Sequence, residues 1–226
     1  PTRRSSDLEM KYMEQRQQIV DFGKKLITEK LTTGTGGNIS IFIREDNVML
    51  ISPSGIPYNE TTPEDIVILD LDGNVVEGTR KPSSEYHMHC IFYKKTDHVN
   101  SVVHTHSDYA TAVACLLQDI EPLHYIIGSV GDRVRCCDYK TFGTQELADE
   151  AYRVMGNNNG ILLGNHGVLA VGPSCAEAFS VAKDIEFLAK LKIRAEAIGK
   201  PVLLNKEQME IVVEKFGTYG QIFEKV

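Results

Sequence analysis

The feature that most restricts the fold is a pair of short apolar runs, residues 39–43 and 48–51, joined by the polar stretch Glu45-Asp46-Asn47. Short runs rich in β-branched residues and bounded by turn-forming residues are typical of the strands of a hairpin. Before them, from Glu14 to Leu31, apolar residues recur near helical spacing with charges between them, which indicates an amphipathic helix. The first quarter of the chain therefore predicts one helix followed by a β-hairpin.

More short apolar runs follow and alternate with helical patterns. We expect a strand over 66–71 that turns at Asp72-Gly73-Asn74 and returns antiparallel through residues 75–76. The other expected elements are a helix starting near Glu85 and capped by Ser83 or Ser84, strands at 101–103, 161–163 and 168–171, and helices over 108–117, 144–155, 174–197 and 206–216. This order predicts strands covered by helices, an α/β or α+β fold.

Length and composition suit one domain. A chain of 226 residues that is 42% hydrophobic can form one sizeable core. We expect a single domain over residues 10–226, because no internal repeat, low-complexity tract or Pro/Gly linker divides it. Residues 1–9 begin without Met and form a polar, basic run with no apolar core segment. We expect them to be a disordered or vector-derived leader and not a signal peptide.

Charge and cysteine usage exclude several classes. No stretch approaches the roughly 18 apolar residues that a membrane span needs, and a net charge of −7 argues against a broad nucleic-acid surface. The number of cysteines is odd and no pair has the C-x-x-C spacing of a metal or redox site, which favours a reducing cytoplasm. The five are Cys90, Cys115, Cys136, Cys137 and Cys175.

The histidines suggest a metal site. His104 and His106 follow an apolar run, and residues two apart on a strand point to the same face, so both imidazoles can meet one ion. His166, between Gly164-Asn165 and Gly167, is a candidate third ligand, and Glu85 a candidate fourth group. Three imidazoles with one open position are typical of a catalytic zinc site.

Plainer readings compete with each of these residues. His166 alone fits a loop residue bonded to the backbone, and Glu85 alone fits a first-turn carboxylate that favours the helix dipole. If the segment from Glu85 is helical, His89 lies one turn away on the same face and is a candidate supporting partner, whereas His87 points to the surface. His98 and His124 have no partner at ligand spacing, and we expect them to be ordinary polar side chains.

A glycine-rich loop over residues 33–38 can present several backbone N–H groups to an anion, because glycines let the chain curl without side-chain obstruction. It follows a helix and leads into a strand, which excludes a dinucleotide-binding fingerprint, and it lacks the Gly-Lys-Ser/Thr of a P-loop. Ser52-Pro53-Ser54-Gly55 and Ser83-Ser84 supply more hydroxyls. These segments are either an anion pocket beside the metal or plain turns and a helix cap.

Five motifs occur in order: Gly-Thr-Gly-Gly-Asn (34–38), Ser-Pro-Ser-Gly-Ile-Pro-Tyr (52–58), Pro-Ser-Ser-Glu (82–85), Val-Val-His-Thr-His (102–106) and Gly-Asn-His-Gly (164–167). In this combination the chain resembles the class II aldolase/adducin-head family over about residues 15–223. The interval from Glu85 to His104 also matches. Departures from the pattern are Ser54 for a threonine, Gly36 for an alanine and Asn165 for a histidine.

The resemblance implies a largely antiparallel central sheet flanked by helices, a cytoplasmic homotetramer with active sites between subunits, and one Zn²⁺ per subunit. It implies that His104, His106, His166 and Glu85 bind the metal, with Glu85 also acting as acid and base. It implies phosphate binding by Thr35, Gly37, Asn38, Ser54, Gly55, Ser83 and Ser84. Leu123-His124-Tyr125 is similar to a segment that delivers a catalytic tyrosine to the neighbouring subunit, and residues 215–220 are similar to a tail that carries a second one, Tyr219.

The implied reaction is the reversible retro-aldol cleavage of a ketose phosphate, L-fuculose 1-phosphate, to dihydroxyacetone phosphate and L-lactaldehyde. Two other enzymes of this family type are alternatives, an L-ribulose-5-phosphate 4-epimerase and a methylthioribulose-1-phosphate dehydratase. The epimerase typically carries Asp where this chain has Glu85. The alternative that is not an enzyme is an adducin-like binding module without a catalytic metal.

Overall fold

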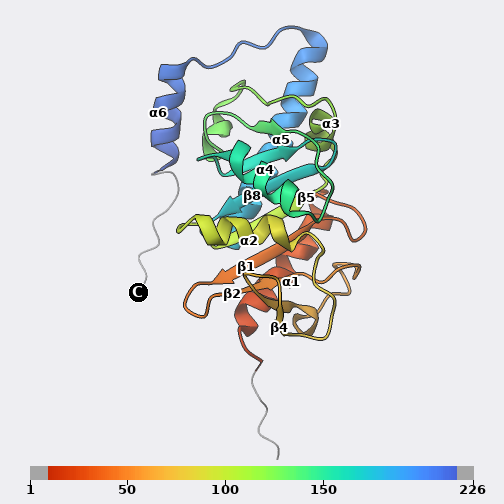
Figure 1. The fold of residues 1–226 in the computed structure, drawn as a ribbon. Helices are drawn as coiled ribbons and strands as arrows, with labels where there is room; N and C mark the ends of the chain where they lie inside the picture. Colours follow the sequence, from red (N-terminus) through yellow and green to blue (C-terminus); the bar gives the residue numbers. More distant parts are fainter. Residues whose placement is uncertain (1–9, 218–226) are drawn as a thin grey trace, which may run out of the picture.

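A single eight-stranded sheet organises the part of the chain that the computed structural model describes, residues 10–217 (Figure 1). Its spatial order is β4-β3-β2-β1-β5-β8-β7-β6, and every neighbouring pair is antiparallel except β6 with β7. The strands are β1 (Asn38–Ile43), β2 (Val48–Ile51), β3 (Val67–Asp70), β4 (Val75–Glu77), β5 (Ser101–Thr105), β6 (Arg135–Cys137), β7 (Gly160–Leu163) and β8 (Gly167–Gly172). The expected α/β fold with a largely antiparallel sheet is confirmed.

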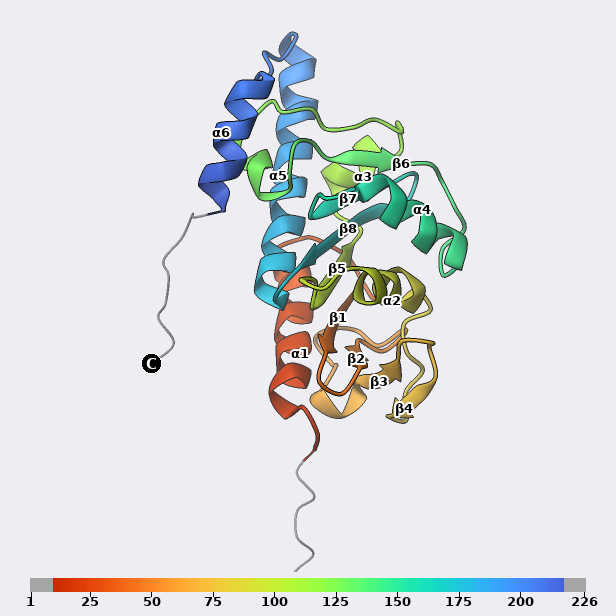
Figure 2. The same cartoon turned by 60° about the vertical axis from the view of Figure 1, so that its left-hand side comes forward.

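Helices cover both faces of this sheet. One face packs against α1 (Met13–Thr28), α3 (Asp108–Ala114) and α5 (Cys175–Ile198), and the other against α2 (Tyr86–Lys95) and α4 (Gln145–Met155). Two short 3-10 helices, η1 (Pro63–Asp65) and η2 (Tyr125–Ser129), lie in connections. The last described helix, α6 (Lys206–Phe216), packs on η2, which in turn packs on α5 (Figure 2).

The two-sided cover follows from the strand pattern. On β7, Leu162 faces the layer of α1, α3 and α5, whereas Ile161 and Leu163 face the layer of α2 and α4. Because both faces are covered, the central strands are apolar at consecutive positions and do not alternate with polar residues. Each such fully buried aliphatic side chain contributes roughly 1.5–3 kcal/mol by leaving water. The sheet centre, where the site lies, is therefore buried and closely packed.

Some predicted boundaries are wrong. The first helix ends at Thr28 and not at Leu31, because Lys30 adopts a left-handed conformation with φ of 58°. The third helix ends at Ala114 and not at Leu117, which has φ of 52°. Strand β6 was not predicted, because its residues form no apolar run. The expectation that residues 1–9 form a leader concerns residues outside the described part, and the single-domain expectation stays a prediction.

Two further observations bear on the class of protein. All five cysteines are free. None of the helices that the structure describes is both long enough and apolar enough to cross a membrane.

Candidate metal centre and substrate pocket

The central strand β5 carries the first candidate metal ligand. His104 lies opposite Asn38 of β1 and Leu169 of β8 in the two antiparallel ladders, and it is fully buried. Its Nδ1 donates a hydrogen bond to the carbonyl oxygen of Val168 at 2.7 Å. That bond places a proton on Nδ1, so in the neutral ring the lone pair of Nε2 is free for a metal.

His106 lies one residue beyond the end of β5. The structure brings its imidazole to that of His104, as the two-residue spacing predicts, and their Nε2 atoms are 2.9 Å apart. Both nitrogens face the same point. Such a pair either shares one proton or binds one positive ion.

His166 reaches the same point from the tip of the β7–β8 hairpin. Leu163 pairs with Gly167 across the turn, and Asn165 adopts the left-handed conformation with φ of 53° that a tight turn needs. Glycine at position 167 is required by packing, because a Cβ atom there would lie 2.3 Å from the carbonyl oxygen of Thr105. The hairpin can therefore lie close against β5 and present His166.

Glu85 completes the cluster from the start of α2, in the helix layer formed by α2 and α4. The expectation that Ser83 or Ser84 caps this helix is wrong, because Glu85 itself is the N-cap residue of α2 and makes no capping bond with its side chain. Ser83 Oγ instead accepts a hydrogen bond from the Glu85 backbone N–H at 3.3 Å. The carboxylate turns to the imidazoles: Oε2 is 3.3 Å from Nε2 of His104, and Oε1 is 3.3 Å from Nε2 of His166.

The cluster fits a divalent metal ion. One ligand atom from each of Glu85, His104, His106 and His166 lies within 4.8 Å of the others. Three imidazoles and one carboxylate are a donor set that suits Zn²⁺ and related transition metals. Within residues 10–217, Oε1 of Glu85 is buried and has no hydrogen-bond donor. A buried carboxylate oxygen without a donor is costly, and a bound cation would compensate it.

The protonation states of Glu85 and His106 favour metal binding. Burial opposes ionisation of Glu85, but the charges of His104 and His166 outweigh it and hold the Glu85 pKa far below its usual range. Burial likewise opposes protonation of His104, and the neighbouring Glu85 carboxylate outweighs it and raises the His104 pKa. Burial and the charges of His104 and His166 lower the pKa of His106 to about 4. Glu85 is therefore ionised and His106 neutral near pH 7, as metal ligands must be.

A pocket of about 500 Å³ opens beside the cluster. Its wall includes Glu85, His106 and His166, together with three loops far apart in sequence. All seven positions that the family resemblance implies for phosphate binding line it: Thr35, Gly37, Asn38, Ser54, Gly55, Ser83 and Ser84. The glycine-rich loop, the Ser-Pro-Ser-Gly turn and the Ser83-Ser84 pair therefore converge, and the reading of each as an isolated turn or cap is insufficient.

Gly37 shows why glycine is needed in this loop. Its φ is 74°, and a Cβ atom would lie 2.5 Å from the carbonyl oxygen of His104. The loop thus lies directly against the strand that carries the metal ligand. Its backbone can approach a bound anion without side-chain obstruction.

Asn38 links this loop to the metal cluster. Its amide nitrogen donates a hydrogen bond to Oε2 of Glu85 at 2.9 Å, and its amide oxygen is 2.6 Å from Nε2 of His89. His89 lies one turn after Glu85 in α2 and is fully buried, so it contacts the cluster through Asn38, consistent with the supporting position expected from its spacing. The sequence indicated no hydrogen bond between Asn38 and Glu85.

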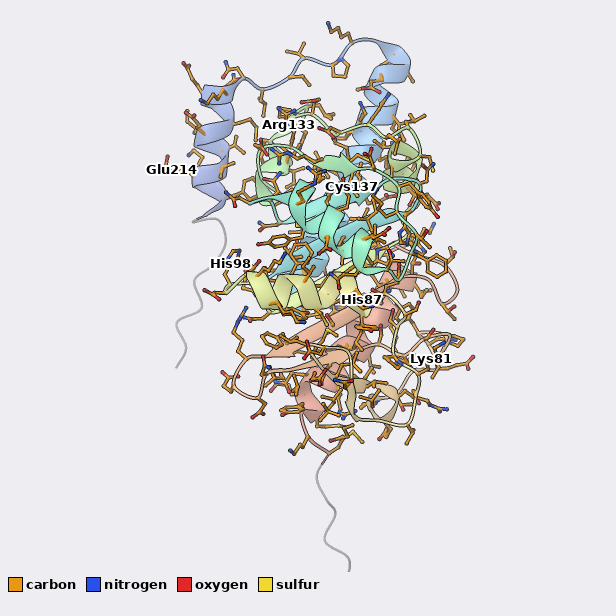
Figure 3. All side chains as sticks on the ribbon, viewed as in Figure 1. Lys81, His87, His98, Arg133, Cys137 and Glu214 are labelled. Atoms are coloured by element: carbon orange, nitrogen blue, oxygen red, sulfur yellow. The ribbon has the colours of Figure 1, made fainter. Side chains whose placement is uncertain are left out.

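The remaining histidines lie away from the cluster. Figure 3 shows His87 near the start of α2 and His98 beyond its opposite end. His87 is half-buried with its ring against Tyr86, at 4.1 Å between centroids, so the expectation of a surface position holds only in part. His124 caps η2, where its Nδ1 accepts a hydrogen bond from the Ile126 backbone N–H at 3.2 Å.

Of the two tyrosines implied by the resemblance, Tyr125 lies in the described residues, and it does not line the pocket beside the cluster. Tyr125 begins η2, is 54% exposed, and does not line the pocket of its own chain. Its ring stacks on Phe216 of α6 at 6.4 Å between centroids. Tyr219 lies outside the described residues.

The pocket has an aromatic wall that sequence reasoning missed. Tyr139 and Phe142 line it and are 55% and 63% exposed. They follow β6, the strand that the sequence did not reveal, and precede the Thr144 cap of α4. The only available signal was the presence of two aromatic residues in an otherwise polar connection.

The chain has the fold of the class II aldolases, and its His/Glu cluster could hold a metal ion. The chain belongs to the Class II Aldolase and Adducin N-terminal domain family, whose sequence profile matches residues 17–193. The 5-deoxy-D-ribulose 1-phosphate aldolase of Bacillus thuringiensis serovar kurstaki is 49% identical over 212 residues, which are 94% of this chain and 100% of that protein. The L-fuculose phosphate aldolase of Escherichia coli is 37% identical over 211 residues, 92% of this chain and 97% of that protein. A solved structure named L-fuculose 1-phosphate aldolase superposes with a TM-score of 0.88 at 42% identity, covering 94% of this chain and 98% of that one.

Proposed function

We propose that this enzyme cleaves a ketose 1-phosphate that ends in a methyl group, releasing dihydroxyacetone phosphate and a short aldehyde. One observation carries the proposal: the His/Glu cluster opens into the same pocket of about 500 Å³ as the glycine-rich and serine loops. A substrate there can have its phosphate on the loops while the atoms that react lie at the cluster. That arrangement favours a phosphorylated sugar and the enzyme over an adducin-like binding module.

The cluster would hold Zn²⁺ through His104, His106 and His166, with Glu85 as a fourth ligand at rest. Bound there, the ion would supply Lewis-acid stabilisation of the negative charge that the donor half of the sugar carries when the carbon-carbon bond breaks. The loops hold the phosphate through backbone N–H groups and the hydroxyls of Ser54, Ser83 and Ser84. They thereby fix the distance between the phosphate and the bond that breaks.

Glu85 is the group placed to move a proton. Its carboxylate is ionised, lies at the wall of the pocket, and is held by only one hydrogen bond, from Asn38. We propose that it exchanges the proton on the carbon of the dihydroxyacetone phosphate half. Tyr125 of a neighbouring subunit in a homotetramer would manage the hydroxyl at the cleaved end, and Tyr219 would help to position it. The exposure of Tyr125 away from its own pocket supports its part of the proposal.

The aldehyde half distinguishes the candidate substrates. 5-Deoxy-D-ribulose 1-phosphate would yield acetaldehyde, and L-fuculose 1-phosphate would yield L-lactaldehyde, with the same phosphorylated product. The first is favoured because the relative named for it is 49% identical over 94% of this chain, against 37% for the relative named for L-fuculose phosphate. The aromatic wall of Tyr139 and Phe142 offers an apolar contact for the terminal methyl group of either sugar.

The test is a substrate panel with product identification. Purified, Zn-loaded protein would be incubated separately with 5-deoxy-D-ribulose 1-phosphate, L-fuculose 1-phosphate, 5-methylthioribulose 1-phosphate and L-ribulose 5-phosphate. We expect dihydroxyacetone phosphate from the methyl-ended 1-phosphates, with the highest kcat/KM for the 5-deoxy sugar. Release of none from any of them would reject the aldolase proposal. A product epimeric with L-ribulose 5-phosphate, or loss of water from the methylthio sugar, would support the corresponding alternative.

A further inference from the structure

Behind Glu85 lies a buried chain of hydrogen bonds that the aldol chemistry leaves unexplained. It runs from Glu85 through Asn38 and His89 to the hydroxyls of Ser40 and Tyr93. These groups come from β1 and α2, and each is at most 7% exposed. No link in the chain is longer than the 2.9 Å between Asn38 Nδ2 and Glu85 Oε2.

The hydrogen bonds of the chain run in one direction, which can be read from the Glu85 carboxylate at its end. A carboxylate only accepts hydrogen bonds, so the nitrogen of the Asn38 amide, and not its oxygen, faces Glu85. The amide oxygen therefore faces His89 at 2.6 Å, and Nε2 of His89 must carry a proton to donate to it. Burial lowers the pKa of His89 to about 3. The ring is neutral, so its Nδ1 accepts from the hydroxyl of Ser40 at 2.6 Å.

The far end of the chain agrees with this direction. Because the Ser40 hydroxyl donates to His89, its oxygen is left to accept from the hydroxyl of Tyr93 at 2.5 Å. Every link of the chain thus joins one donor to one acceptor. Reversing the amide of Asn38 would put its oxygen against the Glu85 carboxylate and its NH₂ group against the N–H of His89, which are two repulsive contacts.

We propose that His89 is a positioning residue that fixes the polarity of the Asn38 amide, so that Asn38 presents only N–H groups to Glu85 and to the substrate pocket. The amide nitrogen has two hydrogens, and Glu85 takes one of them. Asn38 also lines the pocket, so the second hydrogen is available to an anion bound there. An amide turned the other way would present a carbonyl oxygen, which repels both a phosphate and the carboxylate.

The consequence for turnover depends on the proposed aldolase function, but the direction of the hydrogen bonds does not. The first test therefore uses no activity. The full-length protein, labelled with ¹⁵N-histidine, would be examined by long-range ¹H–¹⁵N NMR, with the His89→Gln spectrum used to assign the His89 signals. We expect one neutral ring with a protonated Nε2 and an unprotonated Nδ1, unchanged between about pH 5 and pH 8. A ring protonated on Nδ1 alone would overturn the proposal.

The second test compares variants. His89→Leu removes the N–H that holds the amide, whereas His89→Gln places an amide nitrogen near the position of Nε2 and can donate to Asn38. Loss of an outer hydrogen-bond partner of a metal site typically costs about 10–100-fold in activity or metal affinity. We expect a loss of that size in kcat/KM per bound metal for His89→Leu, including a rise in KM, and recovery of most of it in His89→Gln.

Ser101→Ala is the matched control for general loss of stability. Ser101 is fully buried on the adjacent strand, and its hydroxyl donates to the Ser40 carbonyl oxygen at 2.7 Å without entering the chain. A role of His89 in stability alone would give His89→Leu and Ser101→Ala similar kinetics, or leave His89→Gln as impaired as His89→Leu, and either result would overturn the proposal. If wild-type protein cleaves no sugar phosphate, the proposed function fails, and the NMR result alone decides the inference.

Discussion

Replacing Glu85 by Gln tests the centre of the proposed chemistry, because it removes a charge and a proton acceptor while keeping shape. In the native site the two carboxylate oxygens lie 3.3 Å from Nε2 of His104 and of His166. The amide cannot take up a proton near neutral pH. Its NH₂ group must also face either Asn38, which is itself a donor there, or the imidazoles.

The distance between the Glu85 carboxylate and His104 indicates how much attraction the Glu85→Gln variant loses. At 3.3 Å, a carboxylate and an imidazolium attract each other by about 5 kcal/mol for an effective dielectric constant of about 20, before the cost of burying them. Without that attraction the raised pKa of His104 should fall. For turnover, loss of a general acid and base typically costs about 10²–10⁴-fold, which is about 3–5 kcal/mol in the barrier. The three histidines remain, so most of the metal should stay bound.

The assay is release of dihydroxyacetone phosphate per bound metal ion, with metal content measured on the same sample. Glu177→Gln is the matched control, because Glu177 is an exposed carboxylate in the first turn of α5 and lies outside the metal cluster. We expect the control to keep wild-type turnover and Glu85→Gln to lose most of it. Turnover of Glu85→Gln within about tenfold of wild type, per bound metal, would refute the role of Glu85 as acid and base.

Three other perturbations have defined outcomes. At Gly37, φ is 74° and a Cβ atom would lie 2.5 Å from the His104 carbonyl oxygen, whereas at Gly34, φ is 62° and no atom lies nearby. We expect Gly34→Ala to lower the unfolding free energy by about 1–2 kcal/mol. Gly37→Ala should lower it by more and should also raise KM. His104→Asn should abolish tight metal binding, measured by elemental analysis. In the wild type, metal affinity measured by titration calorimetry should weaken as pH falls, because protons compete for the ligands. A metal affinity independent of pH would contradict the assignment of these residues as metal ligands. Arg16 is 1% exposed and donates to the carbonyl oxygens of Pro63 and Ile66. Because each buried acceptor left without a donor costs about 1–3 kcal/mol, Arg16→Met should lower the unfolding free energy measured in urea by at least about 2 kcal/mol. Unchanged stability would contradict this.

Most of the fold could be predicted from local patterns. The strands β1, β2, β7 and β8 are short apolar runs between turn residues, and α5 is a long helical pattern with a serine cap, so periodicity and turn chemistry were sufficient. β6 could not be predicted, because three residues without an apolar pattern become a strand only through pairing with β7. The helix end at Ala114 was missed because the apolar pattern continues to Leu117, whose left-handed backbone conformation the pattern does not indicate.

The site residues, too, were only partly predictable from the sequence. Spacing alone brought His104 and His106 together, since strand geometry places them on one face. It could not bring in His166 and Glu85, which reach the cluster through the β7–β8 turn and the start of α2, and the family resemblance supplied them. The link from Asn38 to Glu85 had no sequence signal, because it depends on the register of β1 against β5.

That register ties the site to the cooperativity of folding. Asn38 is opposite His104 in the middle of the sheet, and a slip of one residue would turn either side chain to the other face. The pairing of Asn38 with His104 therefore cannot be lost by fraying at an edge of the sheet. Local unfolding that separates these two residues must part central strands whose core residues are fully buried, so it should require nearly the free energy of global unfolding. Slow amide hydrogen exchange and slow inactivation should consequently go together in this protein.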